Sequence, residues 1–293
     1  MFAAMLKRTR SEKIFNVFNI FLLFLVMLAT LYPFYYVFIA SISEGTQVIR
    51  GNVVFYPVGV TLKAYGLIGT IANFWSSYAN TVFYTVFGTL ASLCIMTMGA
   101  YSLSRRRLRG RRLIGLLVSF TMWFSAGIIP FYLNMDSLNL LNNRAGIIFG
   151  FACSAFYIII MRSYFESLPE ELEESAKIDG LSNFRIFLQI MLPLSKPMLA
   201  TVGLYCMVDR WNGYFWAMIM LKDVNKIPLQ VLLKKLIIEN KVLTSIDMGG
   251  AFDFTRETLI YAIVIIAILP MIAVYPFIQR FFVKGLTVGA VKG

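Results

Sequence analysis

The sequence predicts an all-α protein that crosses a lipid bilayer several times. Of its 293 residues, 59% are hydrophobic and 14% are charged, and the mean hydropathy is +0.73. These values lie outside the range of soluble domains. The apolar residues also fall into six long stretches, each near the roughly 20 residues that a helix needs to cross a hydrocarbon core. Composition and stretch length together indicate a polytopic helical membrane protein.

The six predicted spans form one domain, 1–293, without an internal repeat. They cover residues 14–40, 76–103, 113–133, 145–164, 198–221 and 257–283. The first is too long for a signal-peptide core of about 7–15 residues and is expected to be retained. Pro33 allows a kink in it, and Pro270 and Pro276 are expected to interrupt the last span. The external stretch 222–256 contains one amphipathic piece, 227–239.

Basic residues between the spans set the predicted topology. The net charge is +12, and basic residues gather before the first span and in the run Arg105–Arg112 between the second and third spans. Cytoplasmic loops carry an excess of Lys and Arg, so both segments, and with them both termini, are expected in the cytoplasm. A nucleic-acid patch is the alternative for the arginine run. It is disfavoured because the run lies between spans and has no interleaved aromatic residues.

The chain contains no histidine and three isolated cysteines, Cys94, Cys153 and Cys206. Without histidine, there is no histidine general base and no histidine metal ligand. Each cysteine sits within an apolar run and is expected to pack there as a small side chain. The sequence also lacks a G-x-x-x-x-G-K-[ST] phosphate loop, a nucleophile elbow and a zinc-ligand spacing. No catalytic residue, metal site or cofactor is therefore predicted in this chain.

The stretch 167–197 is polar and acidic, and it predicts a helix–turn–helix between the fourth and fifth spans. Ser167 and Glu170 have the spacing of a capping box. Acidic residues crowd the first turns, where the helix dipole favours them. Gly180 can adopt the positive φ that ends a helix. A narrow apolar stripe is expected from Leu168, Leu172 and Ala176.

A second short helix is predicted after Gly180. Its cap is expected to be Ser182 or Asn183. Its apolar face is expected at i, i+3, i+4 and i+7, from Phe184, Phe187, Leu188 and Met191. Pro193 and Pro197 are expected to close it. A rigid acidic hairpin of this kind is suited to binding a protein in the aqueous phase, and a solvated hairpin without a partner is the alternative.

The hairpin also carries residues at a fixed spacing. Glu174-Ser175-Ala176, Gly180, Ile190, Leu192 and Pro193 fit the pattern E-A-A-x3-G-x9-I-x-L-P, with serine in place of the first alanine. This pattern resembles the cytoplasmic loop of the permease subunits of ABC importers, which also precedes the next-to-last span. Trp211-Asn212 and the stretch 281–293 resemble the carbohydrate-uptake branch, the maltose-type importers, in its second-permease type. The run Ser104–Arg112 is similar to a subgroup for oligosaccharides, alginate oligosaccharides among them.

The resemblance implies a permease subunit of an ATP-driven, binding-protein-dependent importer in the bacterial cytoplasmic (inner) membrane, moving an oligosaccharide by alternating access. Its partners would be a second permease subunit, two ATPase subunits that bind ATP and Mg, an extracytoplasmic solute-binding protein and membrane lipid, with no nucleic acid. The resemblance places the ATPase-coupling residues at Glu174, Ser175, Ala176, Asp179, Gly180, Ile190, Leu192 and Pro193.

The fifth span contains the polar stretch Asp209-Arg210-Trp211-Asn212. Each charge at a helix centre costs about 2.5–3.5 kcal/mol on insertion scales, so these side chains are expected to face protein or water. One interpretation is a polar lining of the sugar route, with Tyr214 also on the pathway and Trp211, Tyr214 or Trp216 as stacking faces. The other interpretation is an ion pair that holds this subunit to its partner.

An ion-coupled secondary transporter of a small solute is the rival function. That class needs membrane-embedded acidic residues or broken helices at the midplane in both halves. Only Asp209 qualifies in the sequence, and no matched second half is visible. A membrane enzyme is less favoured still, because no catalytic set supports it.

Overall fold

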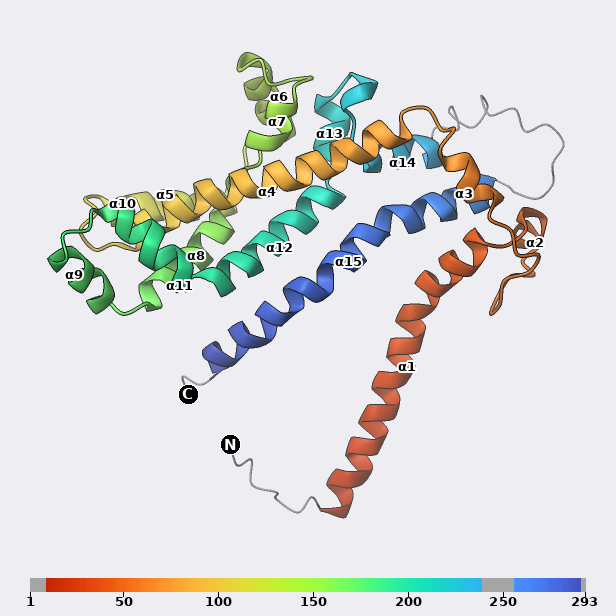
Figure 1. Ribbon diagram of the computed structural model, residues 1–293, viewed down its shortest axis with the longest axis horizontal. Helices are drawn as coiled ribbons and strands as arrows, with labels where there is room; N and C mark the ends of the chain where they lie inside the picture. Colours follow the sequence, from red (N-terminus) through yellow and green to blue (C-terminus); the bar gives the residue numbers. More distant parts are fainter. Residues whose placement is uncertain (1–8, 239–255, 291–293) are drawn as a thin grey trace. The chain divides into compact units, whose positions relative to one another are not determined.

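The computed structural model describes residues 9–238 and 256–290, and every regular element within these ranges is a helix (Figure 1). The chain divides into two compact units, Met1–Thr70 with Leu243–Ile268 and Ile71–Val242 with Leu269–Gly293. The sequence predicts a single domain. Helices that face lipid need not share one hydrophobic core, because lipid tails are as apolar as the side chains. Two units are therefore compatible with one membrane-embedded chain.

The first unit contains α1 (Arg10–Ser41), α2 (Gly45–Ile49) and α3 (Lys63–Ile68). Thr9 and Glu12 form a capping box at the start of α1, and the helix continues through Pro33. Most large apolar side chains between Ile14 and Phe38 are exposed, and a small core lies at the C-terminal end of α1. This apolar helix is long enough to cross a bilayer.

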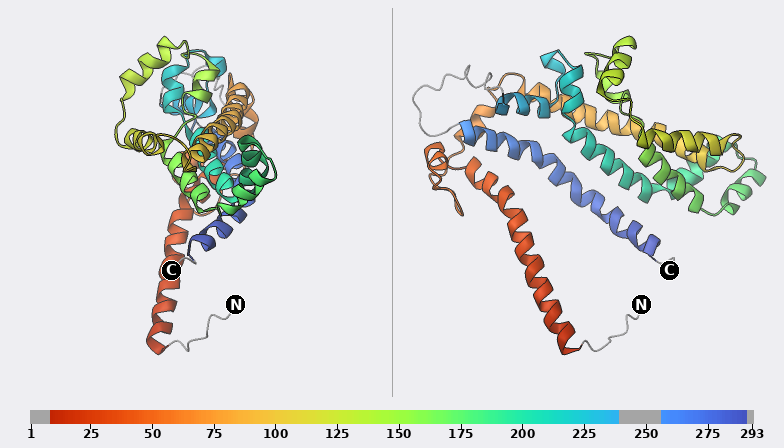
Figure 2. Two further views of the ribbon diagram at one scale, coloured as in Figure 1. Left: turned by 90° about the vertical axis from the view of Figure 1, so that its left-hand side faces the viewer. Right: turned by 180° about the vertical axis from the view of Figure 1, so that it is seen from behind.

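The second unit is built around α4 (Phe74–Ser104), a continuous helix of 31 residues. α8 (Ala155–Ser167) and α12 (Lys196–Asn212) pack along it, as Figures 1 and 2 show. Their facing side chains form one core with the hairpin, including Met96, Tyr101, Met161, Phe165, Phe187 and Met191. Because this core continues from α4 into the hairpin, the hairpin is fixed to the membrane-embedded helices.

The remaining elements of the second unit are short. They are α5 (Arg111–Trp123), α6 (Ile128–Ser137), α7 (Arg144–Phe149), α9 (Glu171–Ile178), α10 (Asn183–Ile186), the π-helix η1 (Phe187–Met191), α11 (Leu192–Leu194), α13 (Phe215–Met220), the 3₁₀ helix η2 (Val224–Lys226) and α14 (Leu229–Ile238). The last helix, α15 (Arg256–Ala290), contributes residues to both units. The predicted amphipathic piece is α14. The stretch 239–255 and the C-terminal residues 291–293 lie outside the described residues.

The predicted spans coincide with continuous helices in three cases and with broken ones in the other three. α1, α4 and α15 are continuous. α5 and α6 meet at a bend of 118°, and the break comes before Pro130, at Gly127 with φ +87°. The predicted fourth span is divided into α7 and α8, and the predicted fifth into α12 and α13. By length and composition, three of the described helices could cross a membrane, or up to five if two bent pairs each count as one span.

Two further expectations need correction. Pro270 and Pro276 lie inside α15, which continues through both and is not interrupted; side-chain hydroxyls, waters and local adjustments can satisfy the carbonyls that a proline leaves free in a membrane helix. Among the cysteines, Cys206 is buried, whereas Cys94 and Cys153 are exposed. Cys94 lies on an outward side of α4 and Cys153 in the break before α8, so a packing role holds for Cys206 alone.

Candidate functional site

The hairpin begins later than the sequence predicts. Ser167 is the last residue of α8, and its hydroxyl donates to the carbonyl of Tyr164 at 2.7 Å. Glu170 occupies the cap position of α9 with helical backbone angles. The predicted capping box is wrong because Pro169 favours an extended Leu168, which has φ −75° and ψ 142°. This extended residue separates Ser167 from α9.

Gly180 ends α9 as predicted, with φ +79°. The amide of Leu181 donates to the carbonyl of Ala176, and the amide of Gly180 donates to that of Lys177, both at 3.0 Å. These two bonds form a Schellman motif, which satisfies carbonyls that a helix end leaves without partners. The turn between the two helices of the hairpin is therefore held by backbone bonds.

Ser182 caps the second helix, where its hydroxyl accepts from the amide of Arg185 at 3.5 Å. The buried face of this helix differs from the predicted one. The buried residues are Ile186, Phe187 and Met191, whereas Phe184 and Leu188 are exposed. The chain forms a π-helical turn over Phe187–Met191, in which Phe187 and Met191 are buried as predicted and Leu188 faces outward.

The second helix ends between Pro193 and Pro197, as predicted. The helical run Asn183–Leu194 ends one residue after Pro193, and Pro197 lies in the first turn of α12. Leu172 is exposed, and the buried residues of α9 are Glu173 and Ala176. Of the predicted apolar stripe, Leu168 packs against the core and Ala176 is buried, whereas Glu173 is buried in place of Leu172.

The signature residues divide into an inner and an outer set. Ala176 is buried, and Ile190 and Leu192 pack against the core of the second unit. The exposed members are Glu174, Ser175, Asp179, Gly180 and Pro193. Ser175, which replaces alanine in the pattern, faces outward and donates its hydroxyl to the carbonyl of Leu172 at 3.3 Å. The inner set fixes the hairpin to the protein, and the outer set is free to meet a partner.

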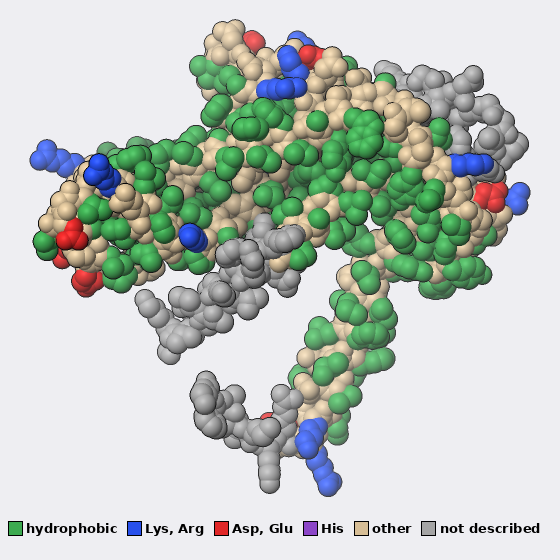
Figure 3. Space-filling view, viewed as in Figure 1, with side chains coloured by type: hydrophobic (Ala, Val, Ile, Leu, Met, Phe, Trp, Pro, Cys, Tyr) green, Lys and Arg blue, Asp and Glu red, His purple; other side chains and the backbone are tan. Residues whose placement is uncertain are grey.

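The outer side of the hairpin also exposes large apolar side chains. Ile178 is 86% exposed and Phe184 is 62% exposed. Charged side chains gather at the same end of the second unit (Figure 3). Glu174 is exposed, and none of the ion pairs in the described parts of the chain includes it. Exposed apolar side chains rimmed by charge are typical of a protein-binding surface.

The groups that hold α9 in place are not among the residues predicted from the sequence. Arg105 directly follows α4, and its Nη1 lies 2.5 Å from Oε2 of Glu173. Its Nη2 donates to the carbonyl of Phe165, in the last turn of α8, at 3.0 Å. The same guanidinium lies 4.8 Å from the centre of the Tyr101 ring. One arginine thus joins α4, α8 and α9.

Glu173 is bound by three cations. Besides Arg105, Nη1 of Arg107 lies 3.2 Å from Oε1 and Nζ of Lys177 lies 2.8 Å from Oε1. Only 7% of the Glu173 side chain is exposed. Burial by itself would raise the pKa of Glu173, but the hydrogen bonds and charges of Lys177 and Arg105 outweigh burial and lower the pKa below its ordinary value. The carboxylate is therefore ionised at neutral pH.

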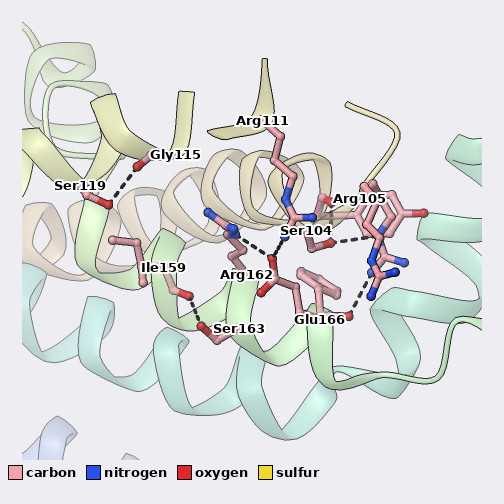
Figure 4. Close-up of polar contacts among 12 residues, drawn as sticks. Ser104, Arg105, Arg111, Gly115, Ser119, Ile159, Arg162, Ser163 and Glu166 are labelled. Atoms are coloured by element: carbon pink, nitrogen blue, oxygen red, sulfur yellow. Dashed lines mark hydrogen bonds and ion pairs between the residues drawn. The ribbon is translucent and has the colours of Figure 1, made fainter. Parts of the chain in front are cut away.

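A second group of ion pairs joins α5 to α8. Figure 4 shows Arg111 and Arg162 converging on the carboxylate of Glu166, with Nε of Arg162 at 2.8 Å. Gly115 leaves room for this arrangement, since a Cβ there would lie 2.8 Å from Nη1 of Arg162. The run Arg105–Arg112 therefore binds acidic side chains of its own chain, beyond any role in topology.

A cavity of about 480 Å³ lies where the predicted fifth span breaks, between α12 and α13. Its volume is within the range of about 300–1,000 Å³ that is typical of small-molecule sites. Aromatic rings make up much of its wall, from Tyr84, Phe151, Phe156, Tyr157, Tyr214, Phe215 and Trp216. A few polar groups join them, among them Ser92, Asp209 and Asn212.

Arg210 reaches from α12 to the break in the predicted fourth span. Its Nη1 donates to the carbonyl of Ile147 at 2.5 Å, and its Nη2 donates to that of Ile148 at 3.2 Å. Both carbonyls lie in the last turn of α7, where a helix end leaves acceptors without partners. Nη2 also donates to the hydroxyl of Ser92 in α4 at 3.2 Å. The geometry favours a structural role for Arg210, with its partners inside this chain.

Asp209 faces the cavity and has a different partner from Arg210. Its Oδ2 accepts from the hydroxyl of Tyr157 at 3.1 Å. Successive helix residues point about 100° apart, which directs the two charges to different neighbours. The ring of Tyr157 stacks on that of Tyr205 with an interplanar angle of 11°. Tyr157 is not among the predicted pathway residues, because one aromatic residue in an apolar span carries no signal that marks a cavity wall.

Asn212, Tyr214 and Trp216 also line the cavity. Trp211 is buried and packs edge-on against Tyr78 of α4, with ring centres 6.1 Å apart. Because α12 directs its indole toward α4, Trp211 does not line this cavity, and its place on the pathway as a stacking face stays a prediction. The structure brings four of the five predicted pathway residues to one cavity: Asp209, Arg210, Asn212 and Tyr214.

Comparison with known proteins gives concordant results. Residues 1–288 match the family described as "Binding-protein-dependent transport system inner membrane component". The polygalacturonan/rhamnogalacturonan transport system permease protein YtcP of Bacillus subtilis is 40% identical over 89% of this chain and 92% of that protein. Protein LplC of the same organism is 38% identical over 98% of both chains. A solved chain of a bacterial ABC transporter involved in the import of the acidic polysaccharide alginate is 48% identical, with a TM-score of 0.89 over 94% of this chain and 99% of that one. This chain belongs to the family of inner membrane components of binding-protein-dependent transport systems.

Proposed function

We propose that this chain is the permease subunit through which an ATP-driven importer moves an acidic oligosaccharide across the bacterial cytoplasmic membrane by alternating access. Family membership supports an importer over the ion-coupled secondary transporter. The complete importer would contain a second permease, two ATPase subunits that bind ATP and Mg and hydrolyse the nucleotide, and an extracytoplasmic solute-binding protein. Both termini of this chain would lie in the cytoplasm.

The observation that carries this proposal is the two-sided hairpin. Its inner side is fixed by the core and by the Arg105–Glu173 ion pair, whereas Glu174, Ile178 and Phe184 face outward. Docking against an ATPase subunit would bury the two apolar side chains, each contributing about 1.5–3 kcal/mol. A hairpin held on its inner side transmits a push from its partner, because it cannot bend away from the helices behind it.

The cavity supports a sugar as the transported solute. Aromatic rings offer flat apolar surfaces for sugar rings, and Asp209, Asn212 and Ser92 offer hydrogen-bonding groups. Nζ of Lys234 in α14 lies 5.0 Å from the centre of the Tyr214 ring and places a positive charge beside this wall. The relatives named for polygalacturonan/rhamnogalacturonan and for alginate support an acidic sugar chain.

Uptake into proteoliposomes that contain the complete importer and its binding protein tests the proposal. We expect ATP-dependent uptake of labelled oligogalacturonate or alginate oligosaccharide and less uptake of neutral maltooligosaccharide. Lys234→Gln should lower acidic uptake about fivefold and leave neutral uptake unchanged, since one charge pair contributes about 1 kcal/mol. Lys235→Gln, on the next residue of α14, is the matched control. Uptake of neutral sugars alone would contradict the acidic substrate, and uptake that needs an ion gradient instead of ATP would contradict the importer.

A further inference from the structure

We propose that Arg105 is a positioning residue that transmits movement of the hairpin to α4 and thereby to the cavity wall. The inference rests on the proposed function, because it takes an ATPase subunit as the source of the movement. Its basis is the place of Arg105 at the junction of three helices, with one bond to α8 and one to α9.

The ion pairs of α9 differ in how firmly they fix its position. Arg106 and Glu170 form a pair at 3.3 Å, but their side chains are 82% and 60% exposed. Water screens such a pair, and both side chains can move independently of the helices. Arg105 and Glu173 are almost entirely buried, and their pair is a short charge-assisted hydrogen bond. A displacement of α9 therefore displaces Arg105 far more than Arg106.

Arg105 stands at the end of an uninterrupted helix. α4 runs from Phe74 to Ser104 without a break, and Tyr84, Ser92 and Met96 on it line the cavity. From Arg105 to Ser92 the path is about 20 Å along the helix axis, at about 1.5 Å per residue. Ser92 in turn accepts a bond from Arg210, which holds the end of α7. A displacement of Arg105 can thus be transmitted to the cavity wall through one continuous helix, with no loop in between.

The bond from Arg105 to the carbonyl of Phe165 adds α8 to the same junction. Tyr157, which binds Asp209 in the cavity, lies on that helix. The apolar contacts between hairpin and core have no preferred direction and allow side chains to slide over one another. The planar guanidinium holds two acceptors in fixed directions, so it resists sliding. Arg105 is therefore suited to make α4 and α8 move together with α9.

A double-mutant cycle in the complete reconstituted importer tests this role. Its variants are Arg105→Gln, Glu173→Gln and the two combined, with Arg109→Gln as the control, an exposed arginine of the same run. Arg105→Gln leaves Glu173 with Arg107 and Lys177, so no buried carboxylate loses all its cations. The measurement is sugar transported per ATP hydrolysed. We expect each single variant to lower this ratio about 2- to 30-fold, the range found for residues that couple distant sites, and the double variant to lower it no further.

Docking is measured separately, through a disulfide that joins the hairpin to the ATPase subunit. One cysteine is introduced by the substitution Ile178→Cys, and the other is placed on the ATPase subunit. Cys94 and Cys153, which are exposed, are replaced by serine in this background. We expect the Arg105 and Glu173 variants to keep the cross-link while losing coupling.

Several outcomes would overturn the positioning role: an unchanged ratio, additive effects in the double variant, or a parallel loss of transport, hydrolysis and thermal stability. Absence of the cross-link in the protein that retains Arg105 would instead contradict the proposed docking. Failure of the inference and failure of the proposed function are therefore distinguishable.

Discussion

Replacing Arg210 by methionine tests whether this arginine holds the broken fourth span together. The substitution keeps a long apolar stem and removes the guanidinium. Three hydrogen bonds are lost, to the carbonyls of Ile147 and Ile148 and to the hydroxyl of Ser92. Two of these acceptors belong to the last turn of α7, a helix of only six residues. We expect the end of α7 to open in the variant.

The magnitude follows from two opposing contributions. Hydrogen bonds that a side chain makes to another helix in a membrane protein contribute on average about 0.6 kcal/mol, and at most about 1.7 kcal/mol, so three contribute about 2–5 kcal/mol. Methionine also removes a charge whose placement at the centre of a membrane helix costs about 2.5–3.5 kcal/mol. The two contributions nearly cancel in the global stability. A melting temperature is therefore a poor measure of this substitution, and a local measure is needed.

Hydrogen exchange of the amides in 144–152, followed by mass spectrometry, is that local measure. A local loss of about 2 kcal/mol corresponds to exchange about 30-fold faster. Asp209→Asn is the matched control, because the Asp209 carboxylate binds Tyr157 and not α7. In that control we expect lower transport and unchanged exchange in 144–152. Exchange within about twofold of the unsubstituted protein in Arg210→Met would refute the structural role of the guanidinium.

Three further substitutions or conditions follow from the same structure. Gly88→Val should disturb the end of α7 as Arg210→Met does, because a Cβ at Gly88 would already lie 3.1 Å from Nε of Arg210. We expect faster hydrogen exchange in 144–152, and unchanged exchange would contradict this close packing. Gly180→Val should destabilise the hairpin by about 1–2 kcal/mol through the left-handed backbone, whereas Gly180→Asn should cost less; the two variants are compared by exchange in α9, and equal effects would argue against backbone strain. The ion pairs of Glu173 should stabilise α9 fully at pH values above 4.5, the ordinary pKa of glutamate, and this stabilisation should be lost as the pH falls through the lowered pKa of Glu173 in the folded protein. Hydrogen exchange in α9 measured against pH tests this expectation. Glu173→Gln should abolish the pH dependence.

Much of the fold can be predicted from local patterns in the sequence. Composition and stretch length predict the membrane class, and the spacing of residues such as Gly180 and Ala176 predicts the hairpin and its turn. These signals depend on neighbours within a few positions. The rule that a residue before proline is extended could have placed Ser167 in α8, since Pro169 stands two residues on. The later start of α9 could thus have been predicted from the sequence, whereas the π-helical turn after Ile186 could not.

The breaks in the fourth and fifth predicted spans are only partly signalled by the sequence. Gly150 follows α7 and Asn212-Gly213 ends α12, and such residues favour turns. The period of an apolar run is the same whether the helix is continuous or divided, so periodicity does not reveal either end. Arg105 and Glu173 are both conspicuous in the sequence, but they stand 68 positions apart. Many acids and many arginines offer pairings, and only the packing of α4 against α8 selects this one.

In both halves of the broken fourth span, an arginine from outside the helix binds backbone carbonyls at its C-terminal end. Arg210 of α12 binds the last carbonyls of α7, and Arg105 after α4 binds the carbonyl of Phe165 near the end of α8. In lipid a helix end without a partner for its carbonyls is costly, so the break after α7 needs a donor, which Arg210 supplies. A donor from a different helix makes the end of one helix depend on the position of another. Arg210 thus ties α7 to α12, and Arg105 ties α8 to the end of α4, so any movement that separates either pair of helices must first break a charge-assisted hydrogen bond.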